Sequence, residues 1–246
     1  MPRQGRAVIP NPSDVLFQRL ADSARLNTEL RQCVSRLTPC CLRHQFSLSA
    51  VDLALEHHQA IGRLFKKGLE GSAAALVRSQ AEAVTAAYWF NYIASDDEVV
   101  QLPTNPMAEA EKVDVPMLYE VSEKLVALFP PMSRIRDALQ SRGPESLRWL
   151  HKYTHGGTPQ LLRRPFTLGW TEIEVHHKLL LADLLAGSAT QSTIVFRPDL
   201  ALDAALAEVR RALDAWRVRY FGGEPTDDET PLPPSERKCC GKPVHA

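Results

Sequence analysis

The 246-residue chain has no long hydrophobic run and no excess of charge of either sign. None of its apolar stretches approaches the roughly 20 residues that a membrane-spanning helix needs, so we expect no membrane partner. Lysine plus arginine equals aspartate plus glutamate at 29 each. The whole surface is therefore not basic enough to attract nucleic acid, and any anion site must be a local patch.

Cysteine is scarce: there are only five, and the odd number and the adjacent pairs argue against a disulfide framework. Three of them, Cys33, Cys40 and Cys41, fall in the N-terminal region, and Cys239 and Cys240 fall in a polar tail. The N-terminal segment MPRQGRAVIPNPSD also lacks the apolar core of a signal peptide. Both features indicate a cytoplasmic protein.

Sustained two-residue alternation of apolar and polar residues, which is typical of strands, is missing as well. Apolar residues instead recur at helical spacing along most of the chain. The sequence therefore predicts an all-α, single-domain bundle of about six to eight helices. We expect a flexible arm at 1–13, the bundle at 14–221 and a proline-rich, disordered tail at 222–246.

Three of the expected helices carry clear signals of burial or capping. The second should start at Ser47 or Ser49 and carry a buried stripe, with His57 and His58 on its surface. The third, 73–94, is apolar nearly all round and should be the central, buried helix. Thr171 is the expected N-cap of a later helix. The stripe of the second helix consists of Val51, Leu55, Ile61, Leu64 and Phe65.

The segment SLRWLHKYTHGG at 146–157 is unusual because it gathers basic side chains, and no acidic residue occurs between 146 and 171. At about 100° per residue, its four basic side chains fall within a sector of roughly 100° on a helix, opposite Leu147, Leu150 and Tyr153. Pro144 suits the first turn of this helix and Gly156 its C-terminal end. The four are Arg148, His151, Lys152 and His155.

A basic helix face is most often simply solvated, and that interpretation stays open. Like charges one turn apart repel each other, however, and an anionic partner such as phosphate would remove the repulsion. Arg163 and Arg164 come soon after in the chain and could extend the patch. Arginine beside histidine can cleave RNA, because histidine exchanges protons near neutral pH and arginine stabilises the charge of the transition state.

Arg148 and His155, with six residues between them, match the R-X4–6-H pattern, and the chain resembles the HEPN superfamily of small all-helical bacterial and archaeal proteins. Over roughly residues 50–215 it also resembles an uncharacterised family of bacterial helical proteins, through an R-x-x-x-E helix and the segment KYTHGGTPQLLRR. The HEPN resemblance implies a metal-independent endoribonuclease or RNA-binding protein in defence or toxin–antitoxin systems, and a homodimer with its site at the two-fold axis. Trp149 stands where these nucleases usually carry a polar residue.

Arg78 and Glu82 are charged residues one turn apart in the most apolar helix. They are either a self-neutralising pair or a pair that faces the basic helix and orients His155. Glu174 and His177 form one Glu-x-x-His element, but a di-iron site needs a second one, which the sequence lacks. We expect no metal site and no cofactor, and no P-loop or dinucleotide-binding motif is present.

Two classes of function therefore remain. In the first, Arg148, His155 and His151 are catalytic, Lys152, Arg163 and Arg164 bind phosphate, and Arg78 and Glu82 support them. In the second, the protein is a non-enzymatic helical interaction module whose Arg/His face binds an acidic surface of a partner protein. An antitoxin-like or defence protein is an expected partner, and a gene for such a protein beside this one would favour the first class.

Overall fold

The structure, a computed structural model, describes residues 12–102, 118–128, 136, 147–155, 157–163 and 169–193. Of the arm expected at 1–13, residues 1–11 lie outside these residues, whereas Pro12 and Ser13 are helical, so the first helix begins two residues earlier than expected. The tail expected at 222–246 lies outside them altogether. Within them the chain is helical and contains no strand, which confirms the all-α prediction. The elements are α1 (Pro12–Val34), α2 (Leu42–Lys66), α3 (Glu70–Tyr88), the π-helical turn η1 (Trp89–Ile93), α4 (Asp96–Val100), α6 (Leu118–Leu128), α8 (Leu147–Thr154), α9 (Thr158–Arg163) and α10 (Glu172–Gln191).

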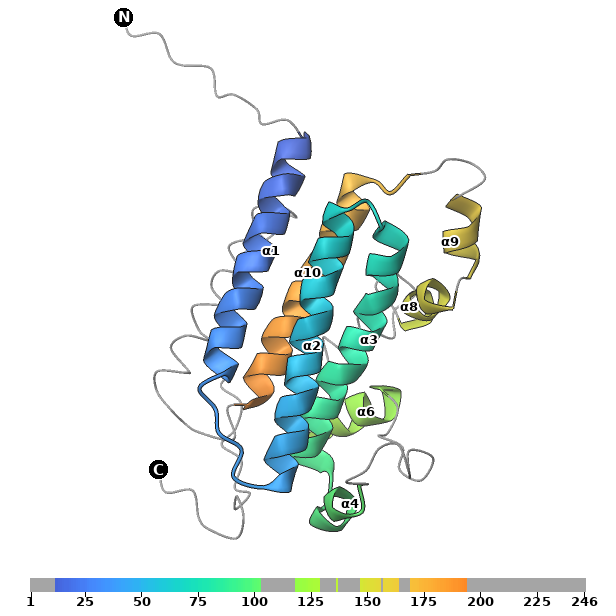
Figure 1. The fold of residues 1–246 in the computed structure, drawn as a ribbon. Helices are drawn as coiled ribbons and strands as arrows, with labels where there is room; N and C mark the ends of the chain where they lie inside the picture. Colours follow the sequence, from blue (N-terminus) through green and yellow to red (C-terminus); the bar gives the residue numbers. More distant parts are fainter. Residues whose placement is uncertain are drawn as a thin grey trace, which may run out of the picture.

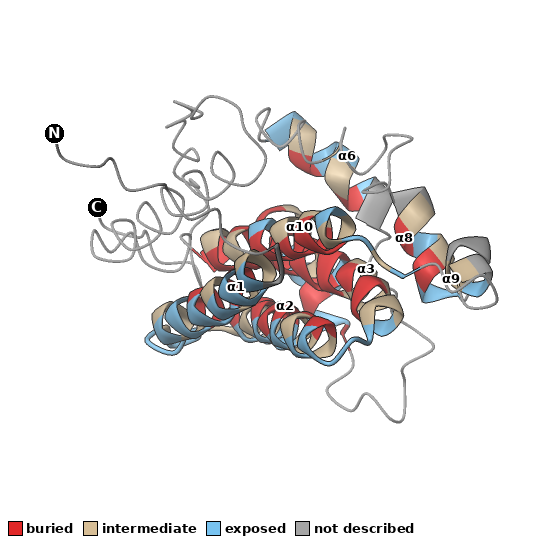
Figure 2. Ribbon diagram, turned by 90° about the horizontal axis from the view of Figure 1, so that it is seen from above, coloured by how far each residue is buried: buried red, intermediate tan, exposed pale blue. Residues whose placement is uncertain are grey.

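Four long helices, α1, α2, α3 and α10, pack side by side as the body of the bundle (Figure 1). Helices α6 and α8 lie on α3, and α9 packs on α8. Seen from above, the buried residues of the long helices face one another, while the outer side of α1 and of α2 is exposed (Figure 2). The bundle therefore has one core, and α3 connects that core to α6 and α8.

Helix α3 is the central helix that the sequence predicts. Half of its buried positions are alanine, and side chains this small let neighbouring helices approach closely. These alanines are Ala73, Ala74, Ala81, Ala83 and Ala87. The expected stripe of α2 is also buried, with Leu64 only partly so. Burying each larger apolar side chain contributes about 1.5–3 kcal/mol, which is how these faces hold the bundle together.

Helix α2 begins at Leu42, so the expected start at Ser47 or Ser49 is wrong. Its N-cap is Cys41, which makes no side-chain capping hydrogen bond. The sequence therefore has no Ser, Thr, Asp or Asn at this position to indicate where the helix begins. Ser47 lies inside the helix, where its hydroxyl donates to the carbonyl of Ala87 at 3.4 Å. Phe46 stacks on Phe90 with ring centroids 5.3 Å apart, so tertiary packing extends the helix backward.

The π-helical turn η1 ends α3, and the N–H of Ala94 donates to the carbonyl of Trp89 at 2.9 Å, five residues back. Arg43 of α2 reaches the end of this turn. Its guanidinium donates to the carbonyls of Phe90 and Ala94 at 2.5 and 2.7 Å, and to the carboxylate of Asp96 at 2.6 Å. One cation thus satisfies carbonyls that a helix C-terminus leaves without partners.

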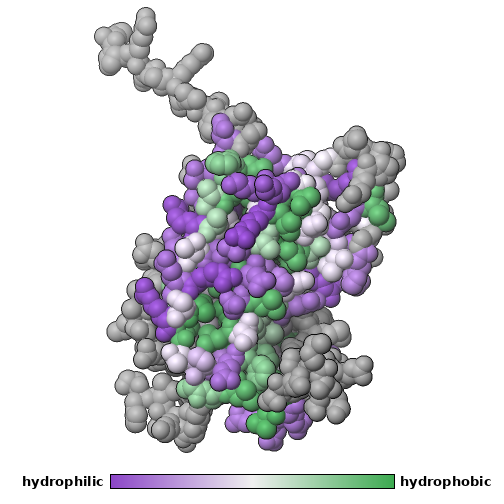
Figure 3. All heavy atoms as spheres, viewed as in Figure 1, coloured by the Kyte–Doolittle hydropathy of each residue, from purple (hydrophilic) through white to green (hydrophobic). Residues whose placement is uncertain are grey.

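The outer surface mixes polar and apolar side chains. Figure 3 shows hydrophilic and hydrophobic atoms interspersed on the face formed by α1, α2 and α3. Among the helices that the structure describes, none is both long and apolar enough to cross a lipid bilayer.

Candidate functional site

Helix α8 is a short amphipathic helix that lies on α3, and its sides are those that the sequence predicts. Leu150 and Tyr153 are buried, whereas His151 and His155 are exposed. The two imidazole rings are one turn apart and their centroids are 4.3 Å from each other. An exposed pair of histidines therefore stands on the outer face of α8.

Arg78 of α3 reaches across to this pair. Its Nη1 lies 3.0 Å from Nδ1 of His151, and its Nε donates to the carboxylate of Glu82 at 2.8 Å. Because a guanidinium only donates, Nδ1 of His151 accepts, and a neutral His151 carries its proton on Nε2. The Arg78–Glu82 pair thus faces the basic helix, which was one of the two alternatives, but its contact is with His151 rather than with the expected His155.

Glycine is required just after α8. The N–H of Gly157 donates to the carbonyl of Lys152 at 2.7 Å, a 6→1 bond that is typical of a Schellman motif. A Cβ at residue 157 would lie 2.8 Å from that same carbonyl oxygen, so a larger residue does not fit. His155 is the last described residue before this sharp turn, which leaves its ring open to solvent. Gly156, the expected end residue, lies outside the described part.

Gln160 of α9 forms hydrogen bonds to both α3 and α8. Its side-chain amide donates to the carbonyl of Gly71, at the start of α3, at 3.1 Å, and to the carbonyl of Tyr153 in α8. A Cβ at residue 71 would lie 2.8 Å from the Gln160 side chain. Helices α3, α8 and α9 are therefore held in contact by one side chain and a glycine.

The remaining basic residues of the region are placed differently from the histidine pair. Lys152 is half-buried, with its ammonium 5.0 Å above the Trp149 ring. Arg163 stacks on Trp170 at 4.3 Å and forms a salt bridge with Glu174 of α10. The phosphate-binding roles predicted for these two cations stay predictions.

Two further predicted residues are only partly described. Arg148 belongs to α8 and lies about one turn before His151 and Lys152, but its side chain is outside the described part. Arg164 is outside it altogether. A role for Arg148 therefore rests only on its position on the helix.

Glu174 caps the start of α10 and also forms a salt bridge with Arg163. Its carboxylate accepts from the backbone N–H of Thr171 at 2.9 Å, while the Thr171 hydroxyl accepts from the N–H of Glu174 at 3.3 Å. This capping box confirms Thr171 as the N-cap. The hydrogen bond from Arg163 is the main cause that holds the pKa of Glu174 at about 2, below its ordinary value.

A second group of polar side chains lies inside the bundle, between α1, α2 and α10. Arg19 and Asp183 form a salt bridge at 2.5 Å, and their side chains are only 1% and 2% exposed. Ser23 donates to Asp183 at 2.7 Å, and Nε2 of His58 lies 2.6 Å from the same carboxylate oxygen. Burial raises the pKa of Asp183, but the His58 and Ser23 hydrogen bonds and the charge of Arg19 outweigh it, so the pKa is lowered.

The tautomer of His58 is set by Asn27. The amide of Asn27 donates to the carbonyl of Leu55 at 2.8 Å and to Nδ1 of His58 at 2.9 Å, and its oxygen accepts from Arg31 at 3.2 Å. Nδ1 of His58 is therefore an acceptor, and the proton on Nε2 is donated to Asp183. Neither nitrogen of His58 has a lone pair left to accept the proton of the Ser23 hydroxyl. Ser23, His58 and Asp183 therefore do not form a catalytic triad.

A pocket of about 270 Å³ opens between α1 and α2 above this buried group, lined by Ser23, Asn27 and His58 and flanked by Phe17 and Lys66. The group was not predicted from the sequence, because His58, which was expected on the surface, is only 2% exposed. The available signal was weak: His58 is three and seven residues from the buried Leu55 and Val51, which puts it on the same face of α2.

The fold and these two groups of side chains define a helical-bundle protein with one exposed and one buried set of charged residues. The chain belongs to a family of unknown function, DUF6988, whose model matches residues 51–215. The match includes α3, α8, α9 and α10, and α1 precedes it. No match was found among curated proteins or among solved structures.

Proposed function

We propose that the exposed face of α8, together with Arg78 of α3, binds the phosphate backbone of RNA and cleaves it without a metal ion. The observation that carries this proposal is the histidine pair itself. Two imidazoles with centroids 4.3 Å apart are exposed, and one of them is oriented by an arginine. The resemblance to HEPN ribonucleases through Arg148 and His155 supports the same assignment.

The chemistry needs one proton acceptor and one proton donor. His155 takes the proton of a ribose 2′-hydroxyl, the 2′-oxygen attacks phosphorus, and the bond from phosphorus to the 5′-oxygen breaks. The His155 imidazolium formed in this way returns its proton through a water molecule to the departing 5′-oxygen, while Nε2–H of the neutral His151 donates a hydrogen bond to the phosphate. The products are a 2′,3′-cyclic phosphate and a 5′-hydroxyl, and His155 is again neutral. Arg148, about one turn before His151, stabilises the negative charge of the transition state.

Arg78 is a positioning residue in this scheme. Glu82 fixes its guanidinium, and the guanidinium fixes Nδ1 of His151 as an acceptor, which keeps the proton of a neutral His151 on Nε2. Arg78→Gln should therefore shift the pH profile of cleavage, which a merely structural role would not do. Arg78→Lys should cleave faster than Arg78→Gln, because it keeps the positive charge as well as a donor beside the ring.

The decisive experiment incubates RNA, in the presence of a chelator, with wild type, His155→Ala, His151→Ala and Arg148→Ala. Each of the three variants should lose about 10²–10⁴-fold of the cleavage rate. His57→Ala is the matched control, because it removes a half-buried histidine from α2, and it should cleave like wild type. Equal cleavage by His155→Ala would end the assignment.

Binding should depend on salt, since neutralising each phosphate releases counterions. RNA affinity should fall steeply between low and moderate salt, and Lys152→Ala should reduce that slope. Wild type that neither binds nor cleaves RNA would favour the alternative, in which the same Arg/His face binds an acidic surface of a partner protein.

The proposal includes a homodimer with the two α8 helices near the symmetry axis, because one histidine pair leaves an RNA strand with few contacts. Light scattering at tens of micromolar should give twice the mass of the chain. A monomer at that concentration would contradict the shared site. Within the same proposal the protein acts in the cytoplasm, in defence or toxicity, beside an antitoxin-like partner.

A further inference from the structure

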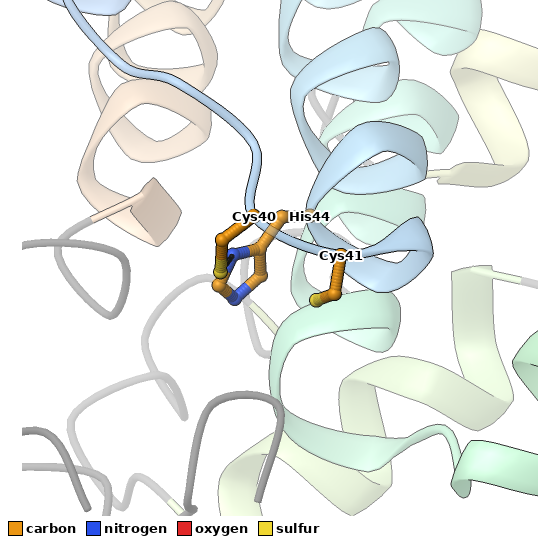
Figure 4. A group of neighbouring side chains, drawn as sticks. All are labelled: Cys40, Cys41 and His44. Atoms are coloured by element: carbon orange, nitrogen blue, oxygen red, sulfur yellow. Dashed lines mark hydrogen bonds between the residues drawn. The ribbon is translucent and has the colours of Figure 1, made fainter. Parts of the chain in front are cut away.

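The connection between α1 and α2 carries three side chains with metal-binding atoms in one place. The thiols of Cys40 and Cys41 and the imidazole of His44 have ligand atoms that all lie within 4.8 Å of one another. Sγ of Cys40 is 3.1 Å from Nδ1 of His44. Figure 4 shows the three side chains clustered where the incoming loop meets the first turn of α2.

We infer that Cys40, Cys41 and His44 form a binding site for a zinc ion, with one coordination position left open. Two thiolates and an imidazole are donors that zinc prefers, with bonds of about 2.3 Å to sulfur and about 2.0–2.1 Å to nitrogen. Tetrahedral geometry then puts ligand atoms about 3.5–3.8 Å apart. The observed group needs shifts of no more than about 1 Å, within reach of small side-chain rotations.

The surroundings favour the charge that zinc ligands carry. The group is at the N-terminus of α2, where backbone N–H groups point outward and stabilise negative charge such as that of a thiolate. The first turn of α2 contains no acidic residue, and the Cys41 side chain is not used as a cap. Sulfur is therefore available at a helix end that suits an anion.

The three ligands differ in their exposure to solvent. His44 is only 4% exposed, so its ring is enclosed by the protein. Cys40 is exposed and Cys41 half-buried, so an ion can enter from solvent through Cys40.

The zinc site is independent of the proposed ribonuclease. The α1–α2 connection lies at one end of the bundle, whereas α9 lies toward the other end (Figure 1). Among the described residues the group has three members, so water would take the open position. Bound zinc would hold the connecting loop against the first turn of α2. No side-chain capping hydrogen bond stabilises this end of the helix.

The test measures zinc binding by the full chain after removal of metal with a chelator, by competition with a chromophoric chelator. All proteins carry Cys239→Ser and Cys240→Ser, so that the thiols of the tail cannot contribute. We expect one equivalent of zinc per chain. Zinc affinity should fall by at least about 100-fold in each of the variants Cys40→Ser, Cys41→Ser and His44→Asn. Replacing residues that only hydrogen-bond to metal ligands already lowers metal affinity by about 10–100-fold, and loss of a ligand should do at least as much.

Cys33→Ser is the matched control, because Cys33 is also a free thiol near the end of α1 but is not in the group. It should bind zinc like the background protein. Cobalt in place of zinc should give thiolate-to-metal charge-transfer absorption that weakens in Cys41→Ser, and circular dichroism should show this conservative variant folded. Absence of zinc binding in the background protein, equal binding by Cys41→Ser, or binding of monovalent copper alone would overturn the inference.

Discussion

Two groups with nearly the same composition, each with an arginine, a histidine and a carboxylate, lie in opposite surroundings in this molecule. Arg19, His58 and Asp183 are buried between α1, α2 and α10, whereas Arg78, Glu82 and His151 lie at the surface between α3 and α8. In the buried group each histidine nitrogen has a protein partner, while in the exposed group Nδ1 of His151 contacts Arg78 and the residue is exposed to solvent. The same residue types thus stabilise the fold in one place and remain available for chemistry in the other.

The largest expected effect comes from removing the buried carboxylate. Asp183→Ala should lower the free energy of unfolding by about 3–5 kcal/mol, because it leaves the charge of Arg19 buried without its carboxylate. Urea unfolding followed by circular dichroism measures this. The matched exposed change is Glu82→Gln, and equal losses in both variants would remove the distinction between the two groups.

A smaller loss is expected at His58. Its replacement by Ala removes a hydrogen bond from Asp183 and leaves the Asn27 amide with one donor unused, which costs about 1–3 kcal/mol. Urea unfolding of His58→Ala beside His57→Ala isolates the effect, since His57 is the half-buried neighbour on the same helix. A stability equal to that of His57→Ala would show that the buried network contributes nothing.

Low pH should weaken the salt bridge between Arg163 and Glu174, which joins α9 to α10. The pKa of Glu174 is held at about 2, below its unfolded value of 4.5, so the charged carboxylate stabilises the folded state above about pH 4.5. This contribution is lost as the pH falls from there toward 2. Solvent screening of the partly exposed pair limits it to about 1 kcal/mol.

The measurement is the difference in unfolding free energy between wild type and Glu174→Gln as a function of pH. The difference should be constant at neutral pH and shrink below about pH 4.5. A difference that does not change with pH would mean that the capping hydrogen bonds, and not the charge, account for the loss.

The smallest stability effect belongs to the exposed pair. Glu82→Gln should change the free energy of unfolding by no more than about 0.5 kcal/mol, because exposed i, i+4 ion pairs contribute little. If the proposed function holds, the same variant should slow RNA cleavage, since Arg78 loses the group that orients it. A large loss of stability with unchanged cleavage would assign the pair to the fold alone.

The regular parts of this fold were readable from hydrophobic spacing. The central position of α3, the stripe of α2 and the Thr171 cap arise from patterns within one segment, and the structure confirms them. The predicted start of α2 was wrong because Phe46 packs against Phe90, which lies far along the chain. A prediction from the spacing of neighbouring residues does not include such a long-range contact.

The charged sites were harder for the same reason. The segment 146–171 contains no acid, yet Glu174 pairs with Arg163 in the fold. Asp183 lies 125 residues from His58 and 164 from Arg19, so no spacing in the sequence joins them. The side of α8 on which its histidines lie was predictable, but the identity of the ring that Arg78 touches was not.

The π-helical turn at Trp89–Ile93 has a consequence for insertions and deletions. A turn closed five residues back holds one residue more than an α-helical turn, so everything after it is rotated by about 100° relative to a continued α-helix. Deleting a single residue there would let α3 continue regularly, yet it would turn Asp96 away from Arg43. The length of this short stretch, rather than its composition, therefore sets where the chain goes next, and a one-residue deletion should be less well tolerated here than in the loop that joins α1 to α2.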